Sequence, residues 1–252
     1  MALTVVLLAA GYATRLYPLT QACPKALLPF GERTILDQVI TTLGDVPQVQ
    51  RIILVTNHRF AGQFEAWQRR SGVNAMILDD QTDSPETRLG AIRDLALARS
   101  RTDAGDDLLV LGTDNLFRWS LAAFVSAAQR VSPHASLALW EAFSREAAVQ
   151  FGVVTRDATS RVTAFVEKSS QPPSTEVALC VYYFPSPMCG AIQQFLETGG
   201  NADAPGYFIA WLAQRQPVYG VMMPGAWYDI GTVEAYHAAL REWYPTIPVP
   251  RP

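Results

Sequence analysis

Short apolar runs alternate with helix-like stretches along the first half of the chain, and this alternation constrains the fold more than any other feature of the sequence. Runs with the length and composition of buried strands occupy residues 3–8, 51–56, 75–78 and 108–111. Helical patterns at residues 34–43 and 61–70 separate them. Strands that alternate with helices predict a parallel, doubly wound sheet, and the ligands of such sheets bind at the carboxyl ends of the strands.

A third helix of this half is predicted to begin at Ser84, after a polar loop over residues 79–84. Ser84 is a suitable N-cap, Pro85 fits the first helical position, and Glu86 places an acid in the first turn.

The alternation loosens after about residue 134, where strand patterns follow one another with fewer helices between them. The predicted strands are residues 136–140, 152–155, 162–167 and 177–184, and the predicted helices are 206–214 and 233–243. No linker interrupts the chain, so we expect one domain with an elaborated second half and a proline-rich tail at 245–252.

The composition is that of a folded protein. A chain of 252 residues that is 49% hydrophobic can bury a sizeable core, which excludes a disordered chain. Twenty Lys and Arg against 23 Asp and Glu give a net charge of −3, so the basic excess expected of a nucleic-acid-binding protein is missing. We expect small-molecule ligands and no nucleic-acid partner.

Three cysteines without a CxxC pair argue against a disulfide framework and suit a reducing compartment. The first apolar run lacks a basic leader and is far too short to span a bilayer. We therefore expect a cytoplasmic protein without a membrane partner, and leave a homo-oligomer open.

The loop after the first strand reads LAAGYATRL and is followed by PKALLP at 24–29. Small residues at Ala9, Ala10 and Gly11 let backbone N–H groups approach a phosphate closely. Arg15 offers a planar fork for such an anion, and Lys25 a point charge. The loop matches neither a Walker A motif nor GxGxxG, and from spacing alone an ordinary strand-to-helix turn is equally compatible.

The run LAAGYATRLYPLT…PKALLPFG resembles the nucleotidyltransferases that join a nucleoside triphosphate to a sugar 1-phosphate, such as glucose-1-phosphate thymidylyltransferases and uridylyltransferases. Further segments resemble the same family, in the family's order: GTDN at 112–115, FGVV at 151–154, VEK at 166–168 with Pro172 and Pro173, and WYDIGT at 227–232. The resemblance implies an α/β fold, a three-layer Rossmann-like (GT-A-like) mixed, mostly parallel sheet with helices on both faces. It also implies a nucleotidyltransferase domain over 1–244, with a nucleotide-binding half at about 1–134 and a sugar-phosphate-binding half at 135–244.

The implied reaction is the in-line attack of a sugar-phosphate oxygen on the α-phosphorus of the nucleotide, with pyrophosphate leaving. Such chemistry needs positioning and charge neutralisation rather than a strong base. The resemblance implies catalytic roles for Arg15, Lys25 and Asp114. It also implies that Asp114 and Asp229 bind Mg²⁺. The implied nucleotide-binding residues are Leu8, Ala9, Ala10, Gly11, Thr14, Arg15, Arg88 and Gly90, and the implied sugar-phosphate-binding residues are Lys25, Asn115, Gly152, Glu167 and Lys168.

Taken singly, these residues also fit plainer roles: Asp114 a helix N-cap, Asp229 a turn acid, and the cations a solvated surface. The sequence departs from the family pattern at Ala13, Thr113 and Cys180, and in the segment 88–91 where the base is expected. We expect dTTP or UTP as the nucleotide. Two alternatives stay open: a cytidylyl- or other nucleotidyltransferase for a non-sugar phosphate or phosphonate, and a non-catalytic nucleotide-binding regulator.

Overall fold

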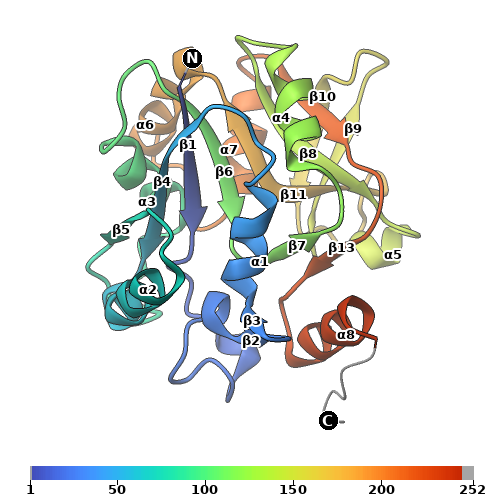
Figure 1. The fold of residues 1–252 in the computed structure, drawn as a ribbon. Coiled ribbons are helices and arrows are strands. Elements are labelled where there is room, and N and C mark those ends of the chain that lie inside the picture. The colour runs from blue at the N-terminus through green and yellow to red at the C-terminus, as the bar shows by residue number, and fades with distance from the viewer. Residues whose placement is uncertain (1, 246–252) are drawn as a thin grey trace.

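A parallel four-stranded unit forms the centre of the protein, whose structure, a computed structural model, describes residues 2–245. The strands β1 (Leu3–Leu8), β4 (Val49–Thr56), β5 (Met76–Asp79) and β6 (Asp107–Gly112) stand in the order β6-β1-β4-β5, and every neighbouring pair is parallel. All four predicted strands of the first half are thereby confirmed. Their carboxyl ends lie at one edge of the sheet, at the lower side of Figure 1.

The second half extends this unit into a mixed sheet of nine strands. Strand β11 runs antiparallel to β6, and it also pairs with β8 and β9. Strand β12 pairs with β8 in parallel and β10 pairs with β9 antiparallel. The bounds are β8 Ala135–Glu141, β9 Gly152–Arg156, β10 Val162–Glu167, β11 Glu176–Phe184 and β12 Val218–Met222.

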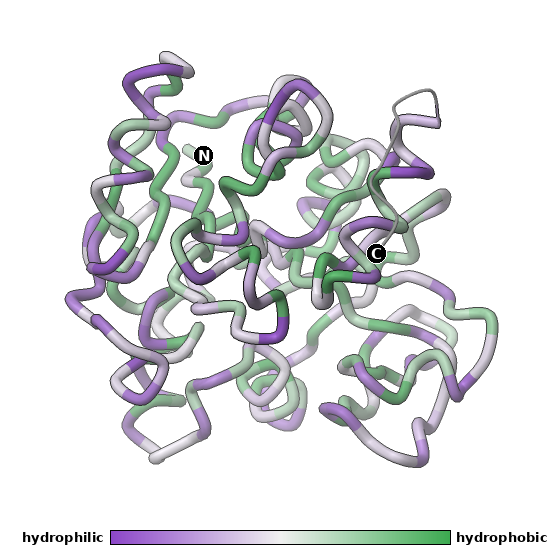
Figure 2. The backbone as a smooth tube through the Cα atoms, turned by 90° about the horizontal axis from the view of Figure 1, so that it is seen from below, coloured by the Kyte–Doolittle hydropathy of each residue, from purple (hydrophilic) through white to green (hydrophobic). Residues whose placement is uncertain are grey.

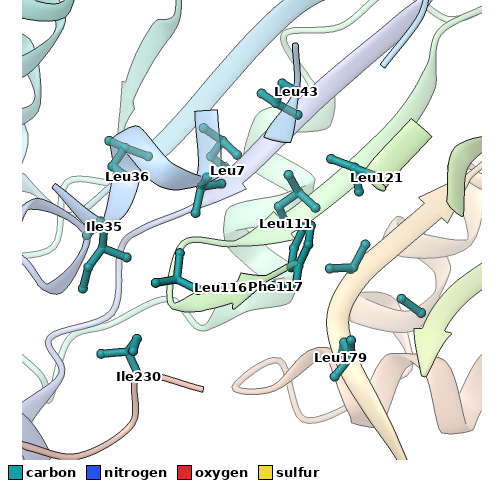
Figure 3. Close-up of a cluster of buried hydrophobic side chains, with 14 of the residues drawn as sticks. Leu7, Ile35, Leu36, Leu43, Leu111, Leu116, Phe117, Leu121, Leu179 and Ile230 are labelled. Carbon is teal, nitrogen blue, oxygen red and sulfur yellow. The ribbon is translucent and has the colours of Figure 1, made fainter. Parts of the chain in front are cut away.

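Helices cover both faces of the sheet, as the two sides of β1 show. Leu3, Val5 and Leu7 point into a cluster that also holds residues of α1, α2 and α4, whereas Val6 points into one that holds residues of α3, α6 and α7. Figure 3 shows the first cluster, with Leu7 near side chains from other elements. The predicted three-layer α/β fold is therefore confirmed. The helices are α1 Ile35–Thr42, α2 His58–Ser71, α3 Ala91–Arg99, α4 Leu121–Gln129, α5 Arg145–Ala148, α6 Gly190–Glu197, α7 Pro205–Ala213 and α8 Val233–Trp243.

Local signals fix several helix starts. Thr34 accepts a hydrogen bond from the Asp37 N–H, and the Asp37 carboxylate accepts one from the Thr34 N–H, so α1 begins with a complete capping box. Asn57, Ser120 and Thr232 cap α2, α4 and α8 in the simpler way, each side chain accepting one backbone N–H.

The helix predicted at Ser84 is not there. The Thr87 N–H donates to the Ser84 carbonyl in a turn, and Arg88 folds back so that Nη1 donates to the Pro85 carbonyl, 2.9 Å away. The helix α3 starts only after Gly90, whose φ of 88° interrupts a regular helix. The three start signals at 84–86 thus stabilise a turn, and the prediction of a helix there is wrong.

Four two- or three-residue strands complete the fold: β2 Pro29–Phe30, β3 Arg33–Thr34, β7 Asn115–Phe117 and β13 Trp227–Asp229. Hydrophilic segments lie mostly on outer loops and helices when the chain is seen from below (Figure 2). Within residues 2–245, no helix combines the length and the apolar character that a membrane crossing requires. Most of the proline-rich tail, residues 246–252, lies outside the described part of the chain.

Candidate active site

Two aspartates meet beyond the carboxyl ends of β1 and β6. The short strand β7 turns back directly after Asp114, and β13 pairs with it so that Asp229 lies opposite Asn115. The Ile230 N–H also donates to the Asp114 carbonyl, 3.0 Å away. Backbone pairing thus holds Asp114 and Asp229 close together, although they are far apart in the sequence. Strands β7 and β13 lie side by side in Figure 1.

The Asp114 carboxylate is held by a cation and an amide. Lys25 Nζ lies 2.6 Å from Asp114 Oδ2, and Asn115 Nδ2 donates to Asp114 Oδ1 at 2.7 Å. Asn115 Oδ1 in turn accepts from Trp227 Nε1 at 2.8 Å. Burial opposes ionisation of Asp114, but the Lys25 ammonium and the amide outweigh it and hold the pKa of Asp114 below its usual value. A strand and not a helix follows Asp114, so the N-cap interpretation does not apply.

Asp229 is in the opposite electrostatic situation. Burial and the neighbouring Asp114 charge raise the pKa of Asp229 to about 6, although Lys25 and Arg15 partly counter this. Two adjoining carboxylates that resist ionising together suit a divalent cation, which would relieve their repulsion. Among the described residues no group of three or more His, Cys, Asp and Glu side chains forms a metal site. Two carboxylates are nevertheless a suitable protein share for Mg²⁺, which keeps several waters and binds substrate phosphates.

A cleft of about 510 Å³ begins at the loop after β1. Ala13 has a left-handed backbone (φ 48°), and its carbonyl accepts a hydrogen bond from the Thr20 hydroxyl at 2.8 Å. The Thr113 hydroxyl donates to the Leu8 carbonyl at 3.0 Å, so the residue that departs from the family pattern holds the start of the loop. The predicted nucleotide-binding residues that line this cleft are Leu8, Ala10, Gly11, Thr14, Arg15, Arg88 and Gly90. Ala9 instead lines an adjoining 100 Å³ cavity together with Lys25 and Asp114.

A second cleft of about 220 Å³ adjoins the first. The predicted sugar-phosphate-binding residues Asn115, Gly152, Glu167 and Lys168 all line it, whereas Lys25 does not. Arg15, Asp114 and Cys180 line both clefts, so the two open onto each other at Asp114.

Two glycines make room for Glu167 in the second cleft. A Cβ added to Gly152 would lie 2.6 Å from the Phe165 ring, and one added to Gly206 would collide with Glu167 Oε2. Burial raises the pKa of Glu167, and the Lys168 charge only partly offsets it. Gly206 was not among the predicted site residues, although the helix predicted over 206–214 begins with it and Pro205 before it is a helix-start residue.

Cys180 lies on β11 at the floor shared by both clefts. A Cβ added to Gly112 would lie 2.9 Å from Cys180 Cβ, so the thiol fills space against the end of β6. Burial, followed by the Asp114 charge, raises the pKa of the thiol far above its usual value. Cys180 is therefore a neutral, space-filling side chain.

Only two of the 20 basic residues are lysines, Lys25 and Lys168, and both belong to this site. The remaining 18 are arginines. Lysine presents a compact charge where arginine presents a planar fork, so the two positions differ in kind from the rest of the basic surface.

Three acidic residues of the first cleft were not predicted: Asp80, Asp94 and Asp203. Asp203 pairs with Arg88 at the rim, where Arg88 Nε lies 2.8 Å from Asp203 Oδ1. Asp80 follows β5, and Asp94 lies in the first turn of α3. No motif marks these residues, because they meet only when the sheet and α3 are assembled.

A sequence model of the family described as nucleotidyl transferase matches residues 4–244. The chain belongs to this family. The match covers all the segments on which the resemblance to nucleotidyltransferases was based, and the family membership is thereby confirmed.

Two relatives of this family member illustrate how it compares. Mannose-1-phosphate guanylyltransferase 1 of Arabidopsis thaliana is 26% identical over 245 residues, covering 94% of this chain and 63% of the relative. Mannose-1-phosphate guanylyltransferase of Mycobacterium tuberculosis is 28% identical over 232 residues, covering 92% and 62%. The chain thus spans less than two thirds of the length of these relatives. Among solved structures, UDP-glucose pyrophosphorylase complexed with UDP-glucose superposes with a TM-score of 0.81 at 16% identity, covering 98% of this chain and 100% of that one.

Proposed function

We propose that this nucleotidyl transferase family member moves a nucleoside monophosphate from a nucleoside triphosphate to a sugar 1-phosphate and releases pyrophosphate. One observation carries the proposal: a loop-lined cleft and a cleft lined by Glu167 and Lys168 open onto each other at Asp114. A donor in the first cleft and an acceptor in the second would have their phosphates at this junction.

The cationic residues would neutralise the phosphates that must approach each other. Arg15 lines both clefts, and this supports a role in which it would hold the β- and γ-phosphates and help pyrophosphate leave. Lys25, now paired with Asp114, would exchange part of that contact for the α-phosphate or the attacking phosphate. The acceptor phosphate is already anionic, so the reaction needs oriented charge rather than a general base.

The second cleft would bind the sugar. Lys168 and Glu167 both line it. Lys168 would pair with the acceptor phosphate, and Glu167 would accept hydrogen bonds from sugar hydroxyls. Asn115 lines the cleft, but its Oδ1 accepts from Trp227 and its Nδ2 donates to Asp114, so its main action is to orient Asp114. Gly152 leaves room beside Glu167.

Asp114 and Asp229 would hold Mg²⁺, the cofactor that fits two adjoining carboxylates. When bound, the ion supplies charge neutralisation between the two polyanions.

A pyrophosphate-release screen tests the proposal: five nucleoside triphosphates against a panel of sugar 1-phosphates, with and without Mg²⁺. Release should require both substrates and the ion. Asp114→Asn should abolish it, while Asp45→Asn, an equal charge change at an exposed residue, should leave it unchanged. If no pair of substrates gives release, or if phosphocholine-like acceptors replace the sugars, the sugar 1-phosphate assignment is wrong.

Two observations bear on which nucleotide base is used, and they disagree. The sequence resemblance favours dTTP or UTP, whereas the relatives named above are guanylyltransferases.

A further inference from the structure

Four aromatic side chains form a row beside the second cleft. The ring centroids of Phe143 and Trp140 lie 6.1 Å apart, those of Trp140 and Trp227 5.5 Å, and those of Trp227 and Phe151 5.1 Å. The four rings line a hollow of about 340 Å³, which we call the aromatic groove. Phe143 is 88% exposed, although three other rings are close to it. An apolar patch of this kind on the surface indicates a binding site.

The aromatic groove is continuous with the cleft proposed to hold the sugar. Five residues line both: Arg15, Gln150, Phe151, Trp227 and Asp229. An acceptor bound in the second cleft can therefore extend into the groove along this shared border. The second cleft measures about 220 Å³ and the groove about 340 Å³. If the cleft takes one sugar ring, the groove has room for another group of the same size.

Beyond the shared border the aromatic groove is uncharged. Among the residues that line it, only Arg15 and Asp229 carry a charge, and both also line the second cleft. Its neutral polar groups include the exposed amide of Gln150 and the hydroxyl of Thr232. The Thr232 oxygen accepts from the Ala235 N–H, so the hydroxyl proton can be donated to a ligand. Aromatic rings with a few hydrogen-bonding groups are typical of a site for an uncharged ligand.

We propose that the aromatic groove binds a second sugar ring, so that the acceptor is the 1-phosphate of a disaccharide. This inference rests on the proposed function. The faces of a sugar ring consist mainly of C–H groups, which pack on aromatic rings, and its edge carries hydroxyls that donate and accept hydrogen bonds. The aromatic row would cover a face of the ring, and Gln150 and Thr232 would meet its hydroxyls.

Other occupants fit the aromatic groove less well. A second phosphate would find only Arg15 as a cation, with Asp229 also lining the groove. An acyl chain would cover the rings but would leave the Gln150 amide and the Thr232 hydroxyl without partners, which has a cost once water is excluded. A second sugar ring satisfies both kinds of surface.

Steady-state kinetics with extended acceptors tests this inference. The reference acceptor is the sugar 1-phosphate preferred in the pyrophosphate-release screen, used with Mg²⁺ and the preferred nucleotide. It is compared with disaccharide 1-phosphates that carry a glucosyl ring at each free hydroxyl in turn, and with derivatives acylated at the same hydroxyls. One disaccharide 1-phosphate should show a kcat/KM about tenfold above the reference, because contacts remote from the reacting phosphate add binding energy. The acylated derivatives should show no such gain.

Phe143→Ala removes a ring from the aromatic groove and leaves both clefts intact, since Phe143 lines neither. It should cancel most of the gain and leave the kcat/KM of the reference acceptor and the KM of the nucleotide unchanged. Phe143→Tyr keeps the ring and should keep the gain. Met76→Ala is the control, because it removes another exposed apolar side chain that lines neither the clefts nor the groove. Phe143 is outside the core, so its removal leaves no internal cavity.

If no disaccharide 1-phosphate exceeds the reference, or if the gain survives in Phe143→Ala, the inference is wrong, while turnover of the reference acceptor still supports the proposed function. A gain for the acylated derivatives alone assigns the aromatic groove to an apolar chain and also overturns the inference. If neither the sugar 1-phosphates nor the extended acceptors give pyrophosphate release, the proposed function fails with it.

Discussion

Lys25 and Asp114 are joined by an ion pair of 2.6 Å at the junction of the two clefts. The pair links the loop after β1 to the end of β6, and its partners are 89 residues apart in the sequence. In this pair the positive charge of Lys25 and the negative charge of Asp114 compensate each other. Substrate phosphates and a metal ion would then compete for its two members.

Removing Lys25 should impair the chemical step and leave the fold intact. A single transition-state donor typically contributes about 10²–10³ in rate, so Lys25→Ala should lower kcat/KM on that scale. Lys168→Ala is the informative comparison, because it should raise the KM of every phosphorylated acceptor with a smaller effect on kcat. Steady-state kinetics with both substrates varied gives these constants. If the Lys25→Ala enzyme is as active as the parent, Lys25 has no catalytic role and is only a solvated cation.

The metal requirement should depend on pH through Asp229. Burial and the Asp114 charge raise the pKa of Asp229 to about 6, and a protonated carboxyl does not bind a metal ion. The Mg²⁺ concentration for half-maximal rate should therefore rise as the pH falls from 7.5 to 5.5. Initial rates measured over a Mg²⁺ titration at both pH values check this. Full activity after EDTA treatment, or the same Mg²⁺ requirement at both pH values, contradicts the assignment.

Gly206→Ala should act on the acceptor alone. The added methyl would collide with Glu167 Oε2, so Glu167 must move from the wall of the second cleft. We expect a higher KM for the sugar 1-phosphate and an unchanged affinity for the nucleotide. Gly62→Ala is the control, because an added Cβ there has no neighbour within 4 Å and the residue lies inside α2. If the acceptor KM equals that of the control, Glu167 does not bind the sugar.

Stability should fall as the pH rises through the titration of Asp94. Its pKa is raised from 3.8 to about 7, chiefly by burial, so between these values the folded state holds a proton that the unfolded state has lost. The stabilisation is complete below about pH 4 and is lost as the pH rises through about 7.

Asp94→Asn removes this dependence. One pKa unit corresponds to about 1.4 kcal/mol, so the variant should gain on the order of 1–3 kcal/mol relative to the parent at pH 8 and little or nothing at pH 4.5. Urea unfolding at both pH values measures the difference. An equal change at the two pH values means that Asp94 does not titrate as described.

Residues whose role is set locally could be predicted from the sequence. Neighbouring residues determine the apolar run of β1, the start of α1 at Thr34 and the full extent of α8. The structure has all three as predicted. The same local reasoning failed at Ser84, because the positive φ of Gly90 interrupts the helix and a Cβ at this position would collide with the Ala202 backbone, so α3 starts only after it.

Contacts between distant segments could not be predicted. The family motifs supplied Asp114 and Asp229, but their adjacency depends on the pairing of β7 with β13. Asp80 and Asp94 come from a loop and a helix with no shared motif, and their burial arises from packing around them. The second cleft likewise needs Gly206 from α7 against Glu167 from β10.

Transfer of label from the nucleotide shows directly which phosphorus is attacked. The protein is incubated with Mg²⁺, a sugar 1-phosphate and a nucleoside triphosphate labelled with ³²P at either the α- or the γ-phosphate. We expect the α-label to enter a nucleotide sugar and the γ-label to enter pyrophosphate, and the two products to form in equal amounts only when the acceptor is present. Release of either label without the acceptor, or γ-label in the sugar product, would contradict the attack on the α-phosphorus at Asp114.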